Sequence, residues 1–253
     1  MDLGLADRVF VLTGASRGLG FAVAQQLVAD GARVVISSRD ADRVAAATEQ
    51  LGGAAQAIGV AADLGDPATA DRLVAMAMDR FGRLDGALLS VGGPPPGTAL
   101  AATDEQWLTA FQTIFLGAVR TTRTVAAGLT EGGAIALVLS TSARTPITGL
   151  GISNGLRPGL LGAAKDMADE LAPRGVRVIS LLPGRVWTDR NAELFAATPD
   201  PVAARAAAEA AIPMRRMGTP AEFGRVAAFL LSPAASYLTG IAVPVDGGAL
   251  RSL

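Results

Sequence analysis

The sequence contains no cysteine and no histidine, and each absence excludes a kind of chemistry. Without cysteine the chain has no disulfide framework, no thiol nucleophile and no zinc–cysteine site. Without histidine it lacks the usual general base and the commonest ligand of transition metals, so we expect no metal centre. Lys165 is the only lysine and Tyr237 the only tyrosine, which leaves few side chains for acid–base catalysis near neutral pH.

Long apolar runs and basic blocks are also missing. Charged residues or glycines interrupt the apolar runs well before the length of a membrane span, and the opening segment MDLGLADR has no signal-peptide pattern. The formal net charge is −1, and no basic cluster offers a surface for nucleic acid. We therefore expect a cytoplasmic protein that binds neither membranes nor nucleic acids.

The composition favours one globular α/β domain. Of the 253 residues, 50% are apolar, which is enough for a sizeable core. No stretch rich in proline, glycine and serine separates two parts of different composition. We expect a single domain over residues 1–253.

The segment 8–40 organises the chain. A short apolar run at 9–12 suits a buried parallel strand, and Gly14, Gly18 and Gly20 follow it at once. An amphipathic helix to about Gly31 and a second strand at 32–38 come next. Glycines let backbone N–H groups approach a ligand, and the start of a helix favours an anion. The segment predicts a site for the diphosphate of a dinucleotide.

The spacing Thr13-Gly14-x-x-x-Gly18-x-Gly20 resembles the short-chain dehydrogenase/reductase (SDR) family. The similarity continues through Pro183-Gly184-x-x-x-Thr188 to the end of the chain and is greatest to the 3-oxoacyl reductase-like branch. It implies a single Rossmann-type doubly wound parallel sheet of about seven strands with helices on both faces. It also implies the loop residues that contact the cofactor: Gly14, Ser16, Arg17, Gly18, Leu19, Gly20, Ser38, Arg39, Asp63, Leu64, Ser90, Val91, Gly92, Pro183, Gly184, Val186 and Thr188.

The end of the second strand indicates which cofactor is bound. NAD-dependent members of the family typically carry an acid where this chain has Ser38, and Arg39 follows directly. Arg17, in the glycine turn, is a second cation facing the same point. Guanidinium groups suit the 2′-phosphate of NADP(H), so we predict NADP(H). The alternative interpretation is that both arginines are solvated surface residues.

The catalytic half departs from the family pattern. Counted from Ser140, the positions of the family's tyrosine and lysine hold Ser153 and Arg157, and the asparagine position holds Ile114. The resemblance therefore assigns catalysis to Ser140, Ser153 and Arg157, with Ser142 as a further hydroxyl. An aliphatic hydroxyl is a far weaker acid than a phenol. Arginine stays protonated and can donate hydrogen bonds without giving up a proton.

Two segments are candidate walls of a substrate pocket. The stretch Pro94-Pro95-Pro96-Gly97 can be neither regular helix nor central strand, and it is either a wall of the pocket or a plain connector. Residues 189–212 resemble the helical lid of the family's substrate pocket, and the less favoured alternative is a surface helical hairpin.

The resemblance also implies assembly into a homodimer or homotetramer through two long helices near 104–129 and 153–172. Leu160, Leu161, Ala164 and Ala168 are expected to give the second helix a close-packing face. Tyr237 lies in a Ser-Tyr-x-Thr-Gly segment and is interpreted as a packing residue.

Two functions are consistent with an intact cofactor half and an altered catalytic half. The first is an NADP(H)-dependent oxidoreductase for a small carbonyl or alcohol substrate. The second is a catalytically impaired protein that binds NADP(H) as a sensor or assembly partner. A non-redox isomerase or lyase is a third, less favoured hypothesis. The sequence does not identify the substrate.

Overall fold

In the computed structural model, residues 2–129 and 132–252 are described, so residues 1, 130–131 and 253 of the predicted domain lie outside the described part. Seven strands form one sheet in the order β3-β2-β1-β4-β5-β6-β7, and each described pairing is parallel. The strands are β1 Val9–Thr13, β2 Arg33–Ser38, β3 Ala57–Ala61, β4 Gly86–Ser90, β5 Gly133–Val138, β6 Val176–Pro183 and β7 Ile241–Val245. This order confirms the predicted doubly wound fold.

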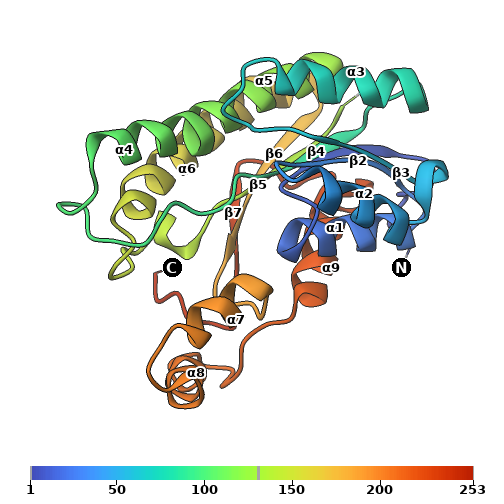
Figure 1. The fold of residues 1–253 in the computed structure, drawn as a ribbon. Helices are drawn as coiled ribbons and strands as arrows, with labels where there is room; N and C mark the ends of the chain where they lie inside the picture. The colour runs from blue at the N-terminus through green and yellow to red at the C-terminus, as the bar shows by residue number, and fades with distance from the viewer. Residues whose placement is uncertain (1, 130–131, 253) are drawn as a thin grey trace.

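Helices cover both faces of the sheet (Figure 1). One layer contains α1 Gly18–Ala29, α2 Ala41–Gln50 and α9 Pro220–Leu231. The other contains α3 Thr69–Phe81, α4 Asp104–Ala110, α5 Gly117–Gly128 and α6 Gly151–Leu171. Short 3₁₀ turns are η1 Gly53–Ala55, η3 Thr141–Ala143, η4 Ala172–Arg174 and η5 Pro233–Ala235. Because both faces are covered, the central strands are mostly apolar, and all five residues of β1 are buried.

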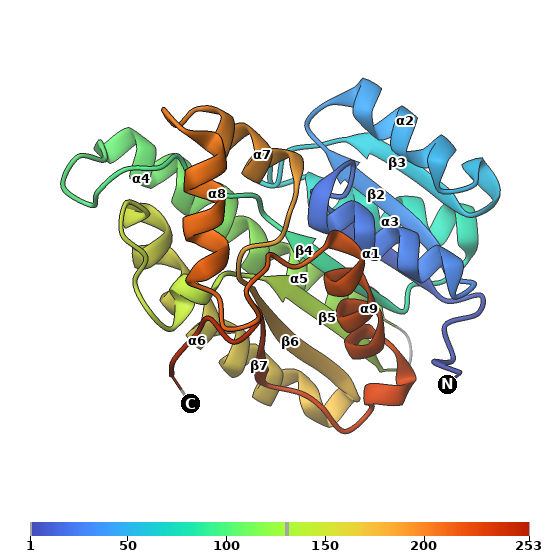
Figure 2. The ribbon, with the colours of Figure 1, turned by 90° about the horizontal axis from the view of Figure 1, so that it is seen from below.

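The helices α7 Asp189–Ala196 and α8 Pro201–Ala210 stand apart from these layers, beyond one end of the sheet (Figures 1 and 2). They occupy the segment predicted as a lid. Phe195, Ile212 and Met217 form a small apolar cluster there, separate from the two clusters that fill the faces of the sheet. Trp187 stacks on Phe195, and the Arg205 guanidinium lies 4.2 Å from the centre of the Trp187 ring.

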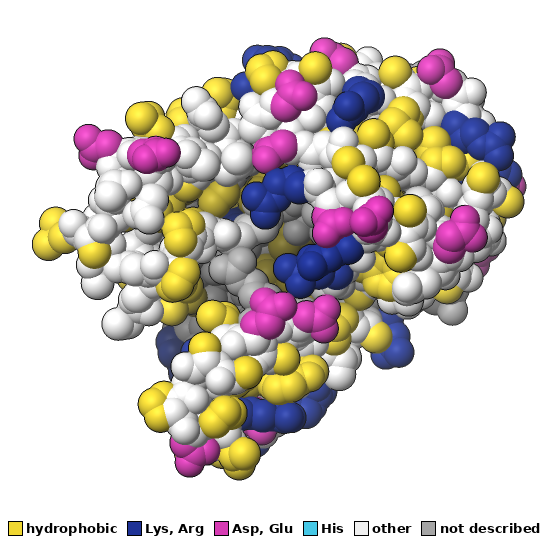
Figure 3. All heavy atoms as spheres, in the orientation of Figure 1, with side chains coloured by type: hydrophobic (Ala, Val, Ile, Leu, Met, Phe, Trp, Pro, Cys, Tyr) yellow, Lys and Arg dark blue, Asp and Glu magenta, His cyan; other side chains and the backbone are white. Residues whose placement is uncertain are grey.

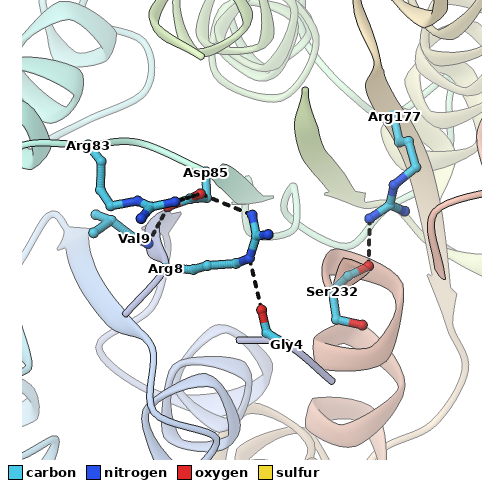
Figure 4. Close-up of polar contacts among 7 residues, drawn as sticks. All are labelled: Gly4, Arg8, Val9, Arg83, Asp85, Arg177 and Ser232. Atoms are coloured by element: carbon cyan, nitrogen blue, oxygen red, sulfur yellow. Dashed lines mark hydrogen bonds and ion pairs between the residues drawn. The ribbon is translucent and has the colours of Figure 1, made fainter. Parts of the chain in front are cut away.

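The amino ends of the strands are closed by charged side chains (Figure 4). Buried Asp85 accepts hydrogen bonds from Arg8, from Arg83 and from the backbone N–H of Val9 at 2.8 Å. Across the sheet, Arg177 donates to Ser232 O at 2.9 Å, and burial lowers its pKa to about 10. These contacts tie the strand starts to the adjacent loops. The opposite edge, at the carboxyl ends, is therefore the one left for a ligand.

Three expectations need correction. The run 104–129 is not one regular helix, because a π-helical turn, η2 Phe111–Leu116, joins α4 to α5. The hydroxyl of Thr113 donates to Thr109 O at 2.9 Å inside this turn, and such local bonds compete with regular helix geometry. The close-packing face of α6 was also assigned wrongly at three of its four residues, whereas Leu161 is half-buried. Leu160, Ala164 and Ala168 are buried against the chain's own sheet and cannot contact another subunit.

The third correction concerns Tyr237, which does not pack within the described chain. Its side chain is fully exposed in the turn after η5, whereas the next residue, Leu238, packs on the core. The packing role belongs to the leucine, so the interpretation of the tyrosine was wrong. Within the described residues, no helix combines the length and the apolar character that crossing a bilayer requires.

Candidate cofactor and active site

The predicted cofactor residues follow the carboxyl ends of five strands. The chain turns from β1 to β2 and β3 on one side of the sheet and then crosses to β4 on the other, so β1 and β4 flank a topological switch point. The ends of these two strands are joined, because Thr13 Oγ1 donates to Ser90 O at 3.1 Å and accepts from Ser90 N at 3.0 Å. Ligands of doubly wound sheets bind in the crevice at such a point.

The glycine turn is built so closely that side chains would not fit. A Cβ on Gly14 would lie 2.6 Å from Ser90 O, and one on Gly20 would lie 2.5 Å from Gly14 O. Gly14 and Gly18 also have φ of +58° and +62°, a region that favours glycine. This is a backbone cradle at the first turn of α1, whose N-cap Arg17 makes no side-chain capping bond. The cradle fits the diphosphate of a dinucleotide.

A second helix begins beside the same cradle. Thr188 is the N-cap residue of α7, makes no side-chain capping bond, and lies with its Cγ2 3.9 Å from the position of a Cβ on Gly18. Gly184 packs so tightly on Asp246 that a Cβ would approach it within 2.6 Å. Val186 is buried and forms a parallel bridge with Gly218. The loop after β6 is therefore held in place at the rim of the cradle.

Ser38, Arg39 and Asp63 lie at the ends of β2 and β3. The hydroxyl of Ser38 is within 3.4 Å of Asp40 O, and Arg39 is exposed. Asp63 is also exposed, and its Oδ1 accepts from Gly65 N at 2.8 Å in a local turn. These residues share the edge of the sheet that carries the glycine turn. Their contacts with a cofactor remain a prediction.

The three serines predicted for the catalytic site lie close together. Ser142 Oγ and Ser153 Oγ are 2.9 Å apart, and both residues are buried. Ser140 is half-buried, and its hydroxyl oxygen accepts from Ser142 N at 3.1 Å. Ile114 is buried in the π-helical turn. Among the three serines, Ser140 is the most accessible.

Arg157 is a buried cation bound to two backbone carbonyls. Its Nη1 donates to Val138 O at 2.7 Å and its Nη2 donates to Gly92 O at 2.6 Å. These acceptors lie at the end of β5 and just after the end of β4, so one guanidinium joins two strand ends to α6. Charge-assisted bonds of this kind are stronger than neutral ones. The planar fork of arginine suits two acceptors, which a lysine ammonium would not bind in the same way.

The start of α6 is also fixed by the stretch after the prolines. Gly97 forms a parallel bridge with Leu150, and its carbonyl accepts from Gly151 N at 2.8 Å. A Cβ on Gly151 would come within 2.3 Å of Ala99 N. Asn154, which the sequence did not single out, donates to Ile147 O and accepts from Ile147 N, both at 2.9 Å. The proline-rich stretch thus positions the helix that carries Ser153 and Arg157.

Charged groups gather at the rim of a hollow between the α7–α8 segment and the rest of the molecule (Figure 3). A cavity of about 390 Å³ there is lined by Ser16, Arg17, Arg43, Asp189 and Glu193 among others. The sequence did not mark Arg43 or the two acids, because isolated exposed charges carry no periodic signal. In the described part of the chain, no cluster of three acids offers a metal site.

The sheet order and the glycine cradle define a Rossmann-type dinucleotide-binding protein. Residues 14–249 match the family model described as enoyl-(acyl carrier protein) reductase. The chain is 35% identical to an uncharacterized oxidoreductase of Mycobacterium tuberculosis over 96% of its own length and 92% of the relative. It is 33% identical to dehydrogenase/reductase SDR family member 4 of Sus scrofa, over 98% of this chain and 89% of the relative.

A solved structure with a similar fold is L-sorbose reductase from Gluconobacter frateurii, complexed with NADPH and L-sorbose. It has a TM-score of 0.92 and 30% identity, and the alignment covers 100% of both chains. The chain belongs to the short-chain dehydrogenase/reductase family of oxidoreductases. The family predicted from the sequence is thereby confirmed.

Proposed function

We propose that this protein is an NADP(H)-dependent oxidoreductase that acts on a small carbonyl or alcohol compound. The observation that carries the proposal is the glycine cradle at the β1–β4 switch point, with Arg17 beside it, together with a cluster of three serines after β5 and at the start of α6. The similarity to a reductase solved with NADPH supports the choice of cofactor. A cytoplasmic location and a homodimer or homotetramer remain predictions from the sequence.

Different residues of the chain would bind the diphosphate, bind the 2′-phosphate and position the loop after β4. The Gly14–Gly20 turn and Thr188 would hold the diphosphate, and Arg17 and Arg39 would hold the 2′-phosphate. The cofactor supplies the hydride chemistry when bound. Gly92, which Arg157 holds through its carbonyl, would fix the loop after β4 against the cofactor. In this proposal Arg157 positions the site and takes no part in proton transfer.

Ser140 is the residue best placed to stabilise a substrate oxygen. Its oxygen already accepts from Ser142 N, so its own O–H is directed elsewhere and serves as a donor. A preorganised donor of this type contributes about 10²–10³ in rate. Ser153 is bound to Ser142 and buried, so we propose that a water molecule supplies the proton in place of the family's tyrosine.

The test is titration with NADPH and NADH, followed by a panel of aldehydes and ketones that includes ketoses, with cofactor oxidation as the readout. We expect tighter binding of NADPH and measurable turnover of at least one substrate. Ser140→Ala should lower that turnover about 100-fold or more while leaving NADPH affinity within twofold. Equal affinity for both cofactors in the unaltered protein would contradict the proposed cofactor preference.

A second function is favoured by the burial of the Ser142–Ser153 pair and of Arg157. The two serines hydrogen-bond to each other, and Arg157 donates to backbone carbonyls. Such internal bonding suits a protein that binds NADP(H) without turning it over. This alternative predicts tight NADPH binding with no oxidation by any member of the panel. The two functions therefore predict the same affinity for NADPH but different turnover.

A further inference from the structure

The cavity lined by α2, α7 and the glycine turn joins cations from the body of the protein to anions from the α7–α8 segment. Arg17 and Arg43 lie on one side, and Asp189 and Glu193 lie on the other. One contact crosses it directly, because Arg17 Nη1 is 3.5 Å from a carboxylate oxygen of Glu193. Arg43 is held differently, by Asp40 at the start of its own helix at 3.1 Å.

Arg17 is thus paired with an acid of the same chain at the place proposed for a phosphate. Both side chains are largely exposed, at 47% and 66%, so the pair itself contributes little to folding stability. A phosphate monoester carries more charge than a carboxylate and binds a guanidinium more strongly. The carboxylate of Glu193 would also repel a doubly charged phosphate at short range.

We propose that Glu193 is a cofactor-selecting residue that competes with the 2′-phosphate of NADP(H) for Arg17. The proposal rests on the NADP(H) preference argued above. Glu193 pairs with Arg17 and thereby links α7 to the glycine turn. NADP(H) must displace this carboxylate, whereas NAD(H) has no 2′-phosphate and leaves the pair in place. Glu193 therefore lowers the affinity for NADP(H) selectively and makes the contact between α7 and the turn depend on the cofactor bound.

The experiment measures the dissociation constants of NADPH and NADH for the full chain and for Glu193→Gln. The matched control is Glu209→Gln, which removes the same charge from α8, where Glu209 accepts from Arg205 within the helix at 2.9 Å. We expect Glu193→Gln to tighten NADPH binding about three- to tenfold at low salt and to change NADH binding less than twofold. The control, Glu209→Gln, should bind both cofactors like the unaltered protein. In an Arg17→Ala background the effect of Glu193→Gln should fall below twofold.

The results distinguish the role of Glu193 from the NADP(H) preference on which it rests. If the unaltered protein binds both cofactors equally, the cofactor preference fails. If it prefers NADPH but Glu193→Gln leaves the ratio of the two constants unchanged, only the role of Glu193 is overturned. Weaker NADPH binding by Glu193→Gln would also overturn it, since Glu193 would then orient Arg17 for the phosphate. Unchanged circular dichroism and melting temperature establish that the exposed variant is folded.

Discussion

Ser142 and Ser153 share a hydrogen bond of 2.9 Å between two buried hydroxyls, at the place where the family pattern has a tyrosine on α6. The bond gives Ser153 a protein partner and leaves it 5% exposed. Ser153 is therefore a poor replacement for a phenol that must reach substrate. This relationship limits how the protein can move a proton and leads to the first prediction.

Restoring the family pattern should create or increase reductase activity. In Ser153→Tyr with Arg157→Lys, a phenol and an ammonium replace the serine hydroxyl and the guanidinium. General acid catalysis is worth about 10²–10⁴-fold, so we expect turnover of simple ketones to rise at least tenfold. The measurement is NADPH oxidation with saturating ketone. A folded double variant that binds NADPH and reduces nothing would favour the function without turnover.

Removing the guanidinium alone should destabilise the protein. Arg157→Met leaves the carbonyls of Val138 and Gly92 without the donors that now bind them. Bonds to charged groups contribute about 1.5–3 kcal/mol each, so we expect a loss of about 3–6 kcal/mol in the free energy of unfolding. The measurement is urea denaturation. Lys165→Met on the same helix, where Lys165 is exposed and paired with Asp169, should cost less than about 0.5 kcal/mol. Similar losses for both variants would contradict a stabilising role of the Arg157 bonds.

The cation after β2 should set the affinity for the 2′-phosphate. Arg39→Ala is expected to weaken NADPH binding by about 1–3 kcal/mol and to leave NADH binding nearly unchanged, because one charge-assisted bond is lost. Calorimetric titration of both cofactors checks this. Arg80→Ala is the control, since Arg80 donates to Ala54 O away from the cradle. An equal loss of affinity for both cofactors would show that Arg39 does not bind the 2′-phosphate.

Acid should remove the contribution of Glu222 to stability. Its pKa is lowered to about 2 by hydrogen bonds from Arg216 and from the backbone N–H of Thr219. Because the pKa of Glu222 in the folded protein lies below its ordinary value of 4.5, the ionised carboxylate stabilises the folded state fully at pH values above about 4.5. The contribution is lost as the pH falls from about 4.5 through about 2. Melting temperatures of the unaltered protein and Glu222→Gln should differ at neutral pH, and the difference should shrink below about pH 4.5 and vanish only near pH 2. A constant difference would contradict the linkage.

Assembly is predicted to use the exposed apolar side chains of α4 and the π-helical turn. Leu108 is 63% exposed, and Phe111 and Leu116 lie close by along the same run. We expect light scattering to give a dimer or tetramer at micromolar concentration. Leu108→Glu should shift it towards monomer, because it places a charge in an apolar contact. Leu194→Glu on α7, also exposed, is the control. A monomeric unaltered protein would refute the prediction.

The sequence predicted the sheet and the cradle well, for local reasons. Most strands are short and mainly apolar runs, and Gly14, Gly18 and Gly20 follow the first of them at the spacing of a dinucleotide-binding turn. The π-helical turn could not be predicted, because the residues of 111–116 have ordinary helical periodicity. The pair Arg17–Glu193 was also missed, since two exposed charges far apart in the chain give no pattern until the fold joins them.

The contacts of Arg157 could not be predicted from its position in the family pattern. Alignment placed it where the family has lysine, and that position alone indicated catalysis. The bonds to Val138 O and Gly92 O depend on where two other strands end, which no local pattern encodes. The sequence could therefore predict a departure from the family pattern at this position but not the contacts that Arg157 makes.

The separate apolar cluster of Phe195, Ile212 and Met217 has a consequence for how this protein can evolve. Because the 189–212 segment has apolar contacts of its own, mutations on its outer surface need no compensating change beneath the sheet. Selection can alter the shape of this segment while the glycine turn stays constant. Outer-surface changes at positions other than Asp189 and Glu193, which face the glycine turn, would then leave the proposed cofactor site unaltered.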